Sequence, residues 1–418
     1  MNSSKDFIFE SSGWNCNKDL LFKDKKILSL MQIKRKNKDI PLFSLLDSDD
    51  DIKKIKDDAK FFVNAEETIT DFTLVGTGGS SLGASAIVKT DIVNKSGINF
   101  HVLDSLDPVT IKNTLSKLPP KTSKFLVISK SGKTTEIIVI MMIIIEWLEN
   151  NNIKINKAIM SMYDFSIGME SPIAKISNEF GLKKTGHHSN IGGRFSALSA
   201  TGLLPACIMG IDPMLLRIAS RKTLNFILNK ENKFILSSSI FASSEINKNK
   251  LNCIINYGDN LTEFLLWYRQ LWSESLGKKG EGIFLLTGKG SVDQHSQLQM
   301  WLDGPNNGLY TFLNFKNIQT DIEIPTYKNI SYIPKTTSSK LLNLMSQSTY
   351  QALGERGRPV RSLTTSDISV VSTVSLMVTF IIEILLVAEL LKVDPYSQDA
   401  VEDIKINTLR KLNKYDSN

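Results

Sequence analysis

The chain has 418 residues, of which 42% are hydrophobic and 22% are charged, and its formal net charge is +7. At about 150 residues per domain this length exceeds one ordinary core, so we expect two large domains. The composition excludes wholesale disorder. Lysines and acidic residues are interspersed rather than gathered into a basic arm, so the charge does not indicate nucleic-acid binding.

Cysteine usage and the N-terminal sequence bear on the compartment. Cys16, Cys207 and Cys253 lie far apart and form no C-x-x-C pair, which favours a reducing cytoplasm. The first residues, MNSSKDFIFESSGWNCNKD, interrupt apolar positions with charge, so we expect no secretory signal peptide.

Hydrophobic patterning predicts the domains in chain order. Residues 1–69 are polar and lysine-rich, with no strand pattern, and are predicted to be helical or irregular. In residues 70–215, short apolar runs begin at Phe72, Ile98, Lys124 and Lys157 and alternate with stretches of helical length. This alternation is typical of a parallel sheet.

A second series of apolar runs begins at Leu251, Ile283 and Leu309, which predicts another parallel sheet within residues 216–395. Residues 396–418 are predicted to be a C-terminal helix, and we expect this helix and the apolar segment before it to cover the second sheet. The predicted fold class is α/β, with two α/β/α sandwich domains built on parallel sheets, plus helical N- and C-terminal segments.

Two apolar stretches raise the question of a membrane span. The run Ile137–Ile145 is too short to cross a bilayer, and Val370–Leu391 carries Glu383 and Glu389, which a bilayer would penalise. We therefore interpret both as buried helices and expect no membrane association.

The loops after the predicted strands are the first candidates for a site, because ligands of open parallel sheets lie at the carboxyl ends of strands. Val75–Ser85, VGTGGSSLGAS, offers glycines that let a ligand approach the backbone, although a plain strand-to-helix turn explains it equally well. Ile128–Glu136, ISKSGKTTE, offers hydroxyls, lysines and a helix start. These features favour a phosphate over a simple helix cap.

Other ligand classes are not indicated. The sequence lacks the GxxxxGK[ST] motif, and GTGGSSLG lacks the dinucleotide-binding glycine pattern. No H-E-x-x-H or CxxC motif occurs, and the adjacent His187 and His188 are poorly placed to bind one metal ion. We expect neither a metal nor another cofactor.

Four further segments combine polar side chains with apolar context, and each alone could be ordinary surface. They are GGRFSALSA, YRQLWSESLGKKG, GSVDQHSQLQ and YSQDAVEDIK, which begin at Gly192, Tyr268, Gly290 and Tyr396. Together with the two loops, and in the same order along the chain, they resemble the glucose-6-phosphate isomerase family, also called the phosphoglucose isomerase family, which is built from two sugar-isomerase domains.

The resemblance implies roles for individual residues. Glu274 matches the family's proton-transferring base and Arg194 matches the cation that stabilises its intermediate. His295 and Lys405 match the ring-opening pair. The remaining matches are substrate-binding positions: Gly79, Ser80, Ser129, Lys130, Ser131, Thr134, Gly193, Gln270 and Gln398.

The same resemblance implies a reversible aldose-ketose isomerisation of glucose 6-phosphate and fructose 6-phosphate in glycolysis and gluconeogenesis. A proton would move between C1 and C2 through a cis-enediol, in a homodimer whose His295 serves the neighbouring subunit. The sequence departs from the family pattern at Lys133, Ile137 and the residues after His295.

Two rival functions stay open at this point. One is a noncatalytic sugar-phosphate sensor, although no helix-turn-helix extension is apparent. The other is a related aldose-ketose isomerase, such as the isomerase half of an amidotransferase, which would need a nucleophile at its mature N-terminus. Mannose 6-phosphate is a conceivable side substrate.

Overall fold

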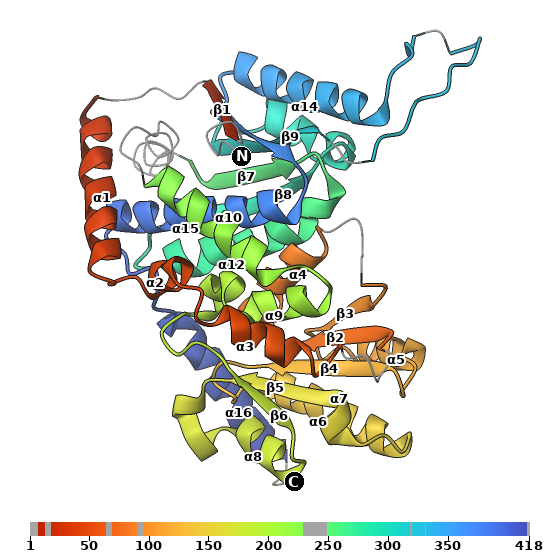
Figure 1. Ribbon diagram of the computed structural model, residues 1–418. Coiled ribbons are helices and arrows are strands. Elements are labelled where there is room, and N and C mark those ends of the chain that lie inside the picture. The colour runs from red at the N-terminus through yellow and green to blue at the C-terminus, as the bar shows by residue number, and fades with distance from the viewer. Residues whose placement is uncertain are drawn as a thin grey trace.

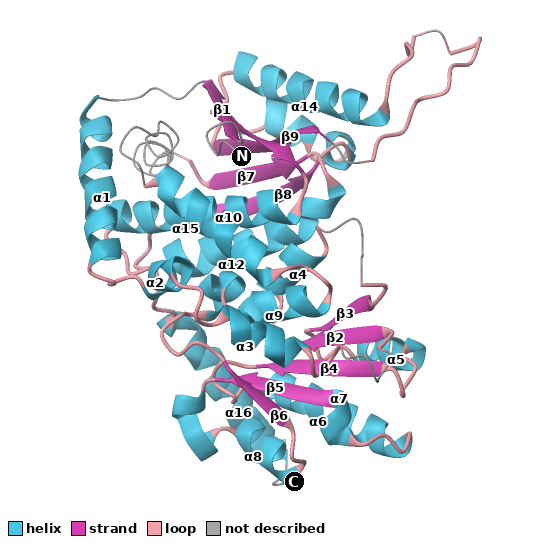
Figure 2. Ribbon diagram, viewed as in Figure 1, coloured by secondary structure: helices cyan, strands magenta, loops and turns pink. Residues whose placement is uncertain are grey.

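The protein is described by a computed structural model that covers residues 7–12, 18–63, 69–90, 96–228, 249–317, 320–330 and 332–415. Side chains are described from residue 26 on, except those of residues 399, 402, 405, 409 and 412–415. Two sheets lie towards opposite ends of the molecule, and a layer of helices fills the space between them (Figure 1, Figure 2).

The first sheet contains five parallel strands in the order β3-β2-β4-β5-β6. They are β2 (Asp71–Val75), β3 (Asn99–Leu103), β4 (Ser123–Ile128), β5 (Ile159–Tyr163) and β6 (Lys183–Gly186). Strands β2 and β4 are buried along their whole length, as expected for central strands covered on both faces. Three helices pack in one cluster against this sheet: α5 (Pro108–Lys117), α6 (Thr135–Asn150) and α8 (Pro172–Glu179).

The second sheet repeats this arrangement with four parallel strands in the order β8-β7-β9-β10. They are β7 (Leu251–Asn256), β8 (Phe284–Lys289), β9 (Gly308–Asn317) and β10 (Val360–Asp367). Helices α13 (Leu298–Asp303) and α14 (Ser338–Glu355) cover its outer face. The fold class predicted from the sequence is therefore confirmed.

The layer between the sheets joins the two halves. It contains α2 (Pro41–Asp47), α3 (Ile52–Ala59), α4 (Leu82–Val88), α9 (Ala200–Ile208), α10 (Pro213–Ile227), α12 (Thr262–Leu276) and α15 (Val370–Leu391), with α1 (Lys18–Lys36) at its side (Figure 1). One hydrophobic cluster runs through this layer from strand β2 to strand β9. Because the two sheets share this core, their loops are held in a defined relation to each other.

Two expectations for the chain ends were wrong. The N-terminal segment contains a strand, β1 (Phe7–Ser12), which pairs antiparallel with β10 at the edge of the second sheet. This pairing satisfies backbone groups that the edge of β10 would otherwise expose. The C-terminal helix α16 (Glu402–Tyr415) lies at the end of the molecule that holds the first sheet, not over the second sheet (Figure 1). The domain boundaries themselves stay predictions.

Helix α15 confirms that Val370–Leu391 is a buried helix. Among the described residues it is the one helix long and apolar enough to cross a membrane, yet 89% of its most apolar window is buried inside the protein. Its buried carboxylate is paired, since Arg361 on β10 donates to both oxygens of Glu383 at 2.9 Å. The Tyr268 hydroxyl on α12 donates to Glu383 Oε1 at 3.1 Å, and Arg361 Nε donates to Thr311 Oγ1 at 2.8 Å. The pair thus connects β9, β10, α12 and α15.

Removing one partner of this ion pair should destabilise the protein strongly, because the other charge stays buried. For Glu383→Gln we expect a loss of about 3–5 kcal/mol in the free energy of unfolding, measured by urea titration, and we expect Arg361→Met combined with Glu383→Leu to recover most of it. Glu389→Gln is the matched control, because its 3.3 Å pair with Lys34 is partly exposed. The control should cost less than about 1 kcal/mol. Equal costs for Glu383→Gln and Glu389→Gln would contradict this interpretation.

Candidate active site

Helix α12 supplies the candidate base. Its buried face packs into the shared core through Trp267, Tyr268, Leu271 and further residues, which leaves Gln270 and Glu274 on another side. These two side chains are one helical turn apart, so they meet. Gln270 Nε2 donates to Glu274 Oε1 at 2.9 Å, and the carboxylate is only partly exposed.

Arg194 comes from the other half of the molecule and reaches the same carboxylate. It lies in the short helix η4 (Gly193–Leu198), and its Nη1 is 3.1 Å from Glu274 Oε2. Every N–H group of its guanidinium has an acceptor. Nη1 also donates to Gln398 Oε1 at 2.8 Å, Nε donates to Ser275 Oγ at 3.1 Å, and Nη2 donates to the carbonyls of Pro395 and Ser397 at 2.6 and 2.9 Å.

The Arg194 charge is held where water has little access, since its side chain is 2% exposed. Burial lowers the pKa of Arg194, and the negative charge of Glu274 opposes this effect. Arginine stays protonated under such conditions. The site therefore offers a fixed positive charge beside a carboxylate in surroundings of low dielectric constant, which strengthens their interaction.

The glycine loop after β2 (residues 76–81) fits closely against the residues that lead up to Arg194 (residues 189–194), here called the arginine segment. A Cβ atom on Gly79 would lie 2.1 Å from the carbonyl carbon of Gly193, so only glycine allows the two backbones to approach this far. Gly78 has a φ of +55°, and a Cβ atom there would lie 2.9 Å from Gln270 Nε2. The half-buried Ser80 follows in the same short helix, η2 (Gly78–Ser80). These glycines bring the loop, η4 and α12 together.

The hydroxyl-rich loop after β4 leads into the first turn of α6. Ser129 Oγ and Thr134 Oγ1 are 2.8 Å apart, and Thr134, the N-cap residue, makes no side-chain bond to the amides of the first turn. Ser131 is exposed. Unpaired amides at the start of a 16-residue helix, next to hydroxyl groups, can hold an anion.

Lys130 links this loop to the segment before Arg194. Its Nζ donates to the carbonyl oxygen of Ile191 at 3.0 Å. Burial lowers the pKa of Lys130, and the charge of Asp164 opposes this effect. The ammonium group thus lies between the hydroxyl-rich loop and the arginine segment rather than in bulk water.

The glycine loop and the hydroxyl-rich loop lie where the strand order of the first sheet reverses. Strand β3 follows β2 in the chain but lies on the opposite side of β2 from β4. The carboxyl ends of β2 and β4 therefore flank the crevice at which open α/β sheets bind ligands.

One predicted site residue does not join this cluster, and the side chain of another is not described. His295 ends the short helix η7 (Val292–His295), is exposed, and makes no hydrogen bond to the described residues. The side chain of Lys405 lies outside the described residues, although its backbone belongs to α16.

Sequence reasoning missed several partners of Arg194. Ser275 follows the predicted base directly, and the carbonyls of Pro395 and Ser397 precede Gln398. Backbone carbonyls leave no signal in a sequence, so only Ser275 could have been suspected from its place beside Glu274.

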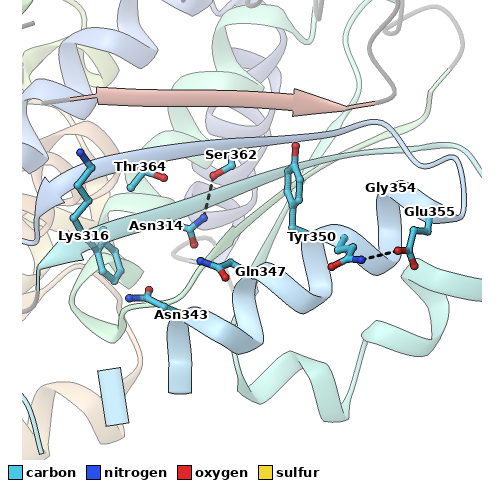
Figure 3. A pocket seen from close by; sticks show the side chains of 11 residues that line it. Asn314, Lys316, Asn343, Gln347, Tyr350, Gly354, Glu355, Ser362 and Thr364 are labelled. Carbon is cyan, nitrogen blue, oxygen red and sulfur yellow. Dashed lines mark hydrogen bonds between the residues drawn. The ribbon is translucent and has the colours of Figure 1, made fainter. Parts of the chain in front are cut away.

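One cavity lies away from this cluster. It has a volume of about 760 Å³, lies between α14 and the strands β9 and β10, and is lined by residues that include Asn314, Asn343 and Gln347 (Figure 3). It includes none of the predicted site residues. Within the described part of the chain, no group of histidine, cysteine, aspartate and glutamate side chains could hold a metal ion.

Comparison with known proteins assigns the family. Residues 50–318 match the phosphoglucose isomerase family. The glucose-6-phosphate isomerase of Thermus thermophilus is 30% identical over 358 residues, which cover 83% of this chain and 85% of that protein. The chain belongs to the phosphoglucose isomerase family.

Two solved structures have a similar fold. A hypothetical protein from Thermus thermophilus has a TM-score of 0.86 at 26% identity and covers 97% of this chain and 100% of its own. A glucose-6-phosphate isomerase from Chlamydia trachomatis has the same fold, with a TM-score of 0.73 at 20% identity over 87% of this chain and 74% of that chain.

Membership of the phosphoglucose isomerase family confirms the predicted enzyme class, an aldose-ketose isomerase. It does not favour the alternative of a noncatalytic sensor. Two departures from the family pattern are explained by the fold. Ile137 lies on α6 and is buried in the core, and Lys133 Nζ lies 3.3 Å from Glu170 Oε2 at the exposed surface.

The close approach of Gly79 and Gly193 gives a direct test of the site's geometry. We expect Gly79→Ala to lower kcat/KM at least about tenfold, because the added methyl group pushes the glycine loop away from Arg194. In the control Gly192→Ala the nearest atom, a ring carbon of Phe195, is 4.0 Å from the new Cβ atom, and the φ of −64° suits alanine. Steady-state kinetics should separate the two variants, and equal activities would refute the argument.

Proposed function

We propose that this isomerase interconverts glucose 6-phosphate and fructose 6-phosphate, as a step of glycolysis and gluconeogenesis. The observation that carries the proposal is the 3.1 Å contact between the buried Arg194 guanidinium and the Glu274 carboxylate, beside the glycine loop. A carboxylate next to a fixed cation suits a reaction that removes a proton and creates negative charge on oxygen.

The phosphate group would bind at the start of α6. Ser129, Ser131 and Thr134 supply hydroxyls, Lys130 supplies charge, and the helix supplies unpaired amides. Holding the phosphate at one end of the substrate fixes the position of C1 and C2 at the other end. Binding energy far from the reacting carbons is thereby converted into orientation.

Glu274 would move the proton. A C–H bond next to a carbonyl group is a very weak acid, whereas a free glutamate has a pKa of about 4.3, so the carboxylate cannot drive the step by basicity alone. One carboxylate that faces both carbons can take the proton from C2 and return it to C1. Gln270, which donates to the other carboxylate oxygen, would hold Glu274 in the required rotamer.

Arg194 would stabilise the cis-enediol intermediate. Negative charge develops on the oxygens of C1 and C2 as the proton leaves. A buried guanidinium, already fixed by its five hydrogen bonds, needs no reorganisation to offset that charge. Gln398 Oε1 and Glu274 Oε2 both accept hydrogen bonds from Arg194 Nη1, so Gln398 would contact the sugar beside the carboxylate.

Ring opening would precede the proton transfer and would use His295 with Lys405. We propose a cytoplasmic homodimer in which His295 of one subunit serves the site of its partner. Support comes from the exposure of His295 and from the connection between β9 and α14, which extends away from the body of the molecule (Figure 1). That connection carries exposed Ile322, Tyr327 and Tyr332, which are 67%, 64% and 83% exposed.

Glu274→Gln tests the assignment of the base. The amide keeps the size of the side chain but cannot accept the C1 proton of fructose 6-phosphate, so we expect kcat for this substrate to fall at least about a hundredfold. The measurement is a coupled assay with purified protein, with circular dichroism to establish that the variant is folded. Near-normal turnover in a folded Glu274→Gln variant would rule out this assignment.

Mixed dimers test the shared site. His295→Ala and Glu274→Gln should each be nearly inactive as homodimers. If His295 crosses to the partner, a heterodimer of the two variants has one site with both defects and one intact site. Each heterodimer should then show about half the activity of a wild-type dimer, and the random mixture of dimers from co-expression should show about a quarter. If His295 acted within its own subunit, both heterodimer sites would carry one defect and no activity would return.

A further inference from the structure

Asp164, which the sequence did not predict as a site residue, lies between the hydroxyl-rich loop after β4 (residues 129–134), here called the phosphate loop, and the arginine segment. It follows β5 directly and is 6% exposed. Its backbone N–H donates to the carbonyl oxygen of Lys130 at 3.0 Å, which extends the pairing of β4 and β5 into the phosphate loop.

The carboxylate of Asp164 joins this loop to the arginine segment. Its Oδ1 accepts from Ser189 Oγ at 2.9 Å, and Ser189 lies five residues before Arg194. The same oxygen accepts from the N–H and Oγ of Ser166 at 3.0 and 2.7 Å, which caps the short helix η3 (Phe165–Glu170). A helix cap alone would need only Ser166. The bond to Ser189 instead links the residue after β5 to the arginine segment.

Lys130 provides a second connection between the same segments, through its bond to the carbonyl oxygen of Ile191. Burial would raise the pKa of Asp164, but the hydrogen bonds from Ser166 and Ser189 and the charge of Lys130 lower it overall. Asp164 is therefore an anion that faces a half-buried ammonium group. Its charge favours keeping Lys130 protonated and in place.

We infer that Asp164 is a positioning residue for the isomerisation: through Ser189 and Lys130 it fixes residues 189–193 against the phosphate loop and so sets the distance from bound phosphate to Arg194. The inference rests on the proposed function, in which the phosphate loop binds the substrate and Arg194 stabilises the intermediate. It predicts a defect in the chemical step rather than in phosphate affinity, because the phosphate loop itself keeps its hydroxyls and helix amides.

The exposed residue Ser189 allows a test that spares the fold. For Ser189→Ala we expect kcat for fructose 6-phosphate to fall about tenfold, with KM changed less than about twofold. Ser189→Thr keeps the hydroxyl and should restore kcat. The double variant Asp164→Ala/Ser189→Ala should have a kcat no lower than that of Asp164→Ala alone, because each substitution removes the same hydrogen bond between Asp164 and Ser189. Ser166→Ala is the control, since it removes only a bond within the cap, and should change kcat less than about twofold.

Two inhibitors distinguish a change in the distance from bound phosphate to Arg194 from a change in phosphate affinity. Inorganic phosphate should inhibit wild type and Ser189→Ala equally. A five-carbon phosphorylated aldonate, whose carboxylate stands where the intermediate carries charge, should bind Ser189→Ala about tenfold more weakly.

Two results would overturn the inference: kcat and aldonate inhibition of Ser189→Ala within about twofold of wild type, or equal losses for phosphate and aldonate. Failure of the wild-type protein to isomerise fructose 6-phosphate would instead refute the proposed function.

Discussion

The buried charge of Arg194 is the constraint on which the site depends. A guanidinium removed from water is tolerated only if its N–H groups find acceptors, and all five do. Those acceptors come from α12 and from the segment Pro395–Gln398, whereas Arg194 itself follows the first sheet. Satisfying one side chain therefore requires both halves of the chain to close around it, and this closure brings the Glu274 carboxylate to the crevice of the first sheet.

The two halves contribute differently although their strands are arranged alike. Both sheets place the first strand of the half, β2 or β7, between the second and the third. The helices after these strands, α4 and α12, pack against each other in the shared core. In the first half the strand ends carry glycines and hydroxyls that suit a phosphate. In the second half α12 carries the carboxylate. Under the proposed mechanism the first half would hold the phosphate and supply Arg194, and the second half would supply the base.

Several elements were predictable because burial on both faces requires continuous apolar runs, as in β4 and β9. Strands β6 and β10 were missed because their sequences, KKTG and VRSLTTSD, are polar. Strand β10 buries Arg361 only because Glu383, far along the chain, neutralises it. The loops after β2 and β4 were found from local glycines and hydroxyls. The meeting of Arg194 with Glu274, and the part played by Asp164, depend on contacts between distant segments that no local pattern reveals.

The central claim is that one carboxylate carries a proton between adjacent carbons while a fixed cation offsets the charge. Isotope transfer tests it most directly. Glucose 6-phosphate with deuterium at C2, converted briefly in ordinary water and analysed by NMR, should give fructose 6-phosphate with deuterium at C1 in part of the product and solvent hydrogen in the rest. The mixture is expected because the protonated Glu274 can exchange with water before it returns the label. Complete retention of deuterium, with no solvent hydrogen at C1 at any time, would indicate a hydride shift and contradict the account.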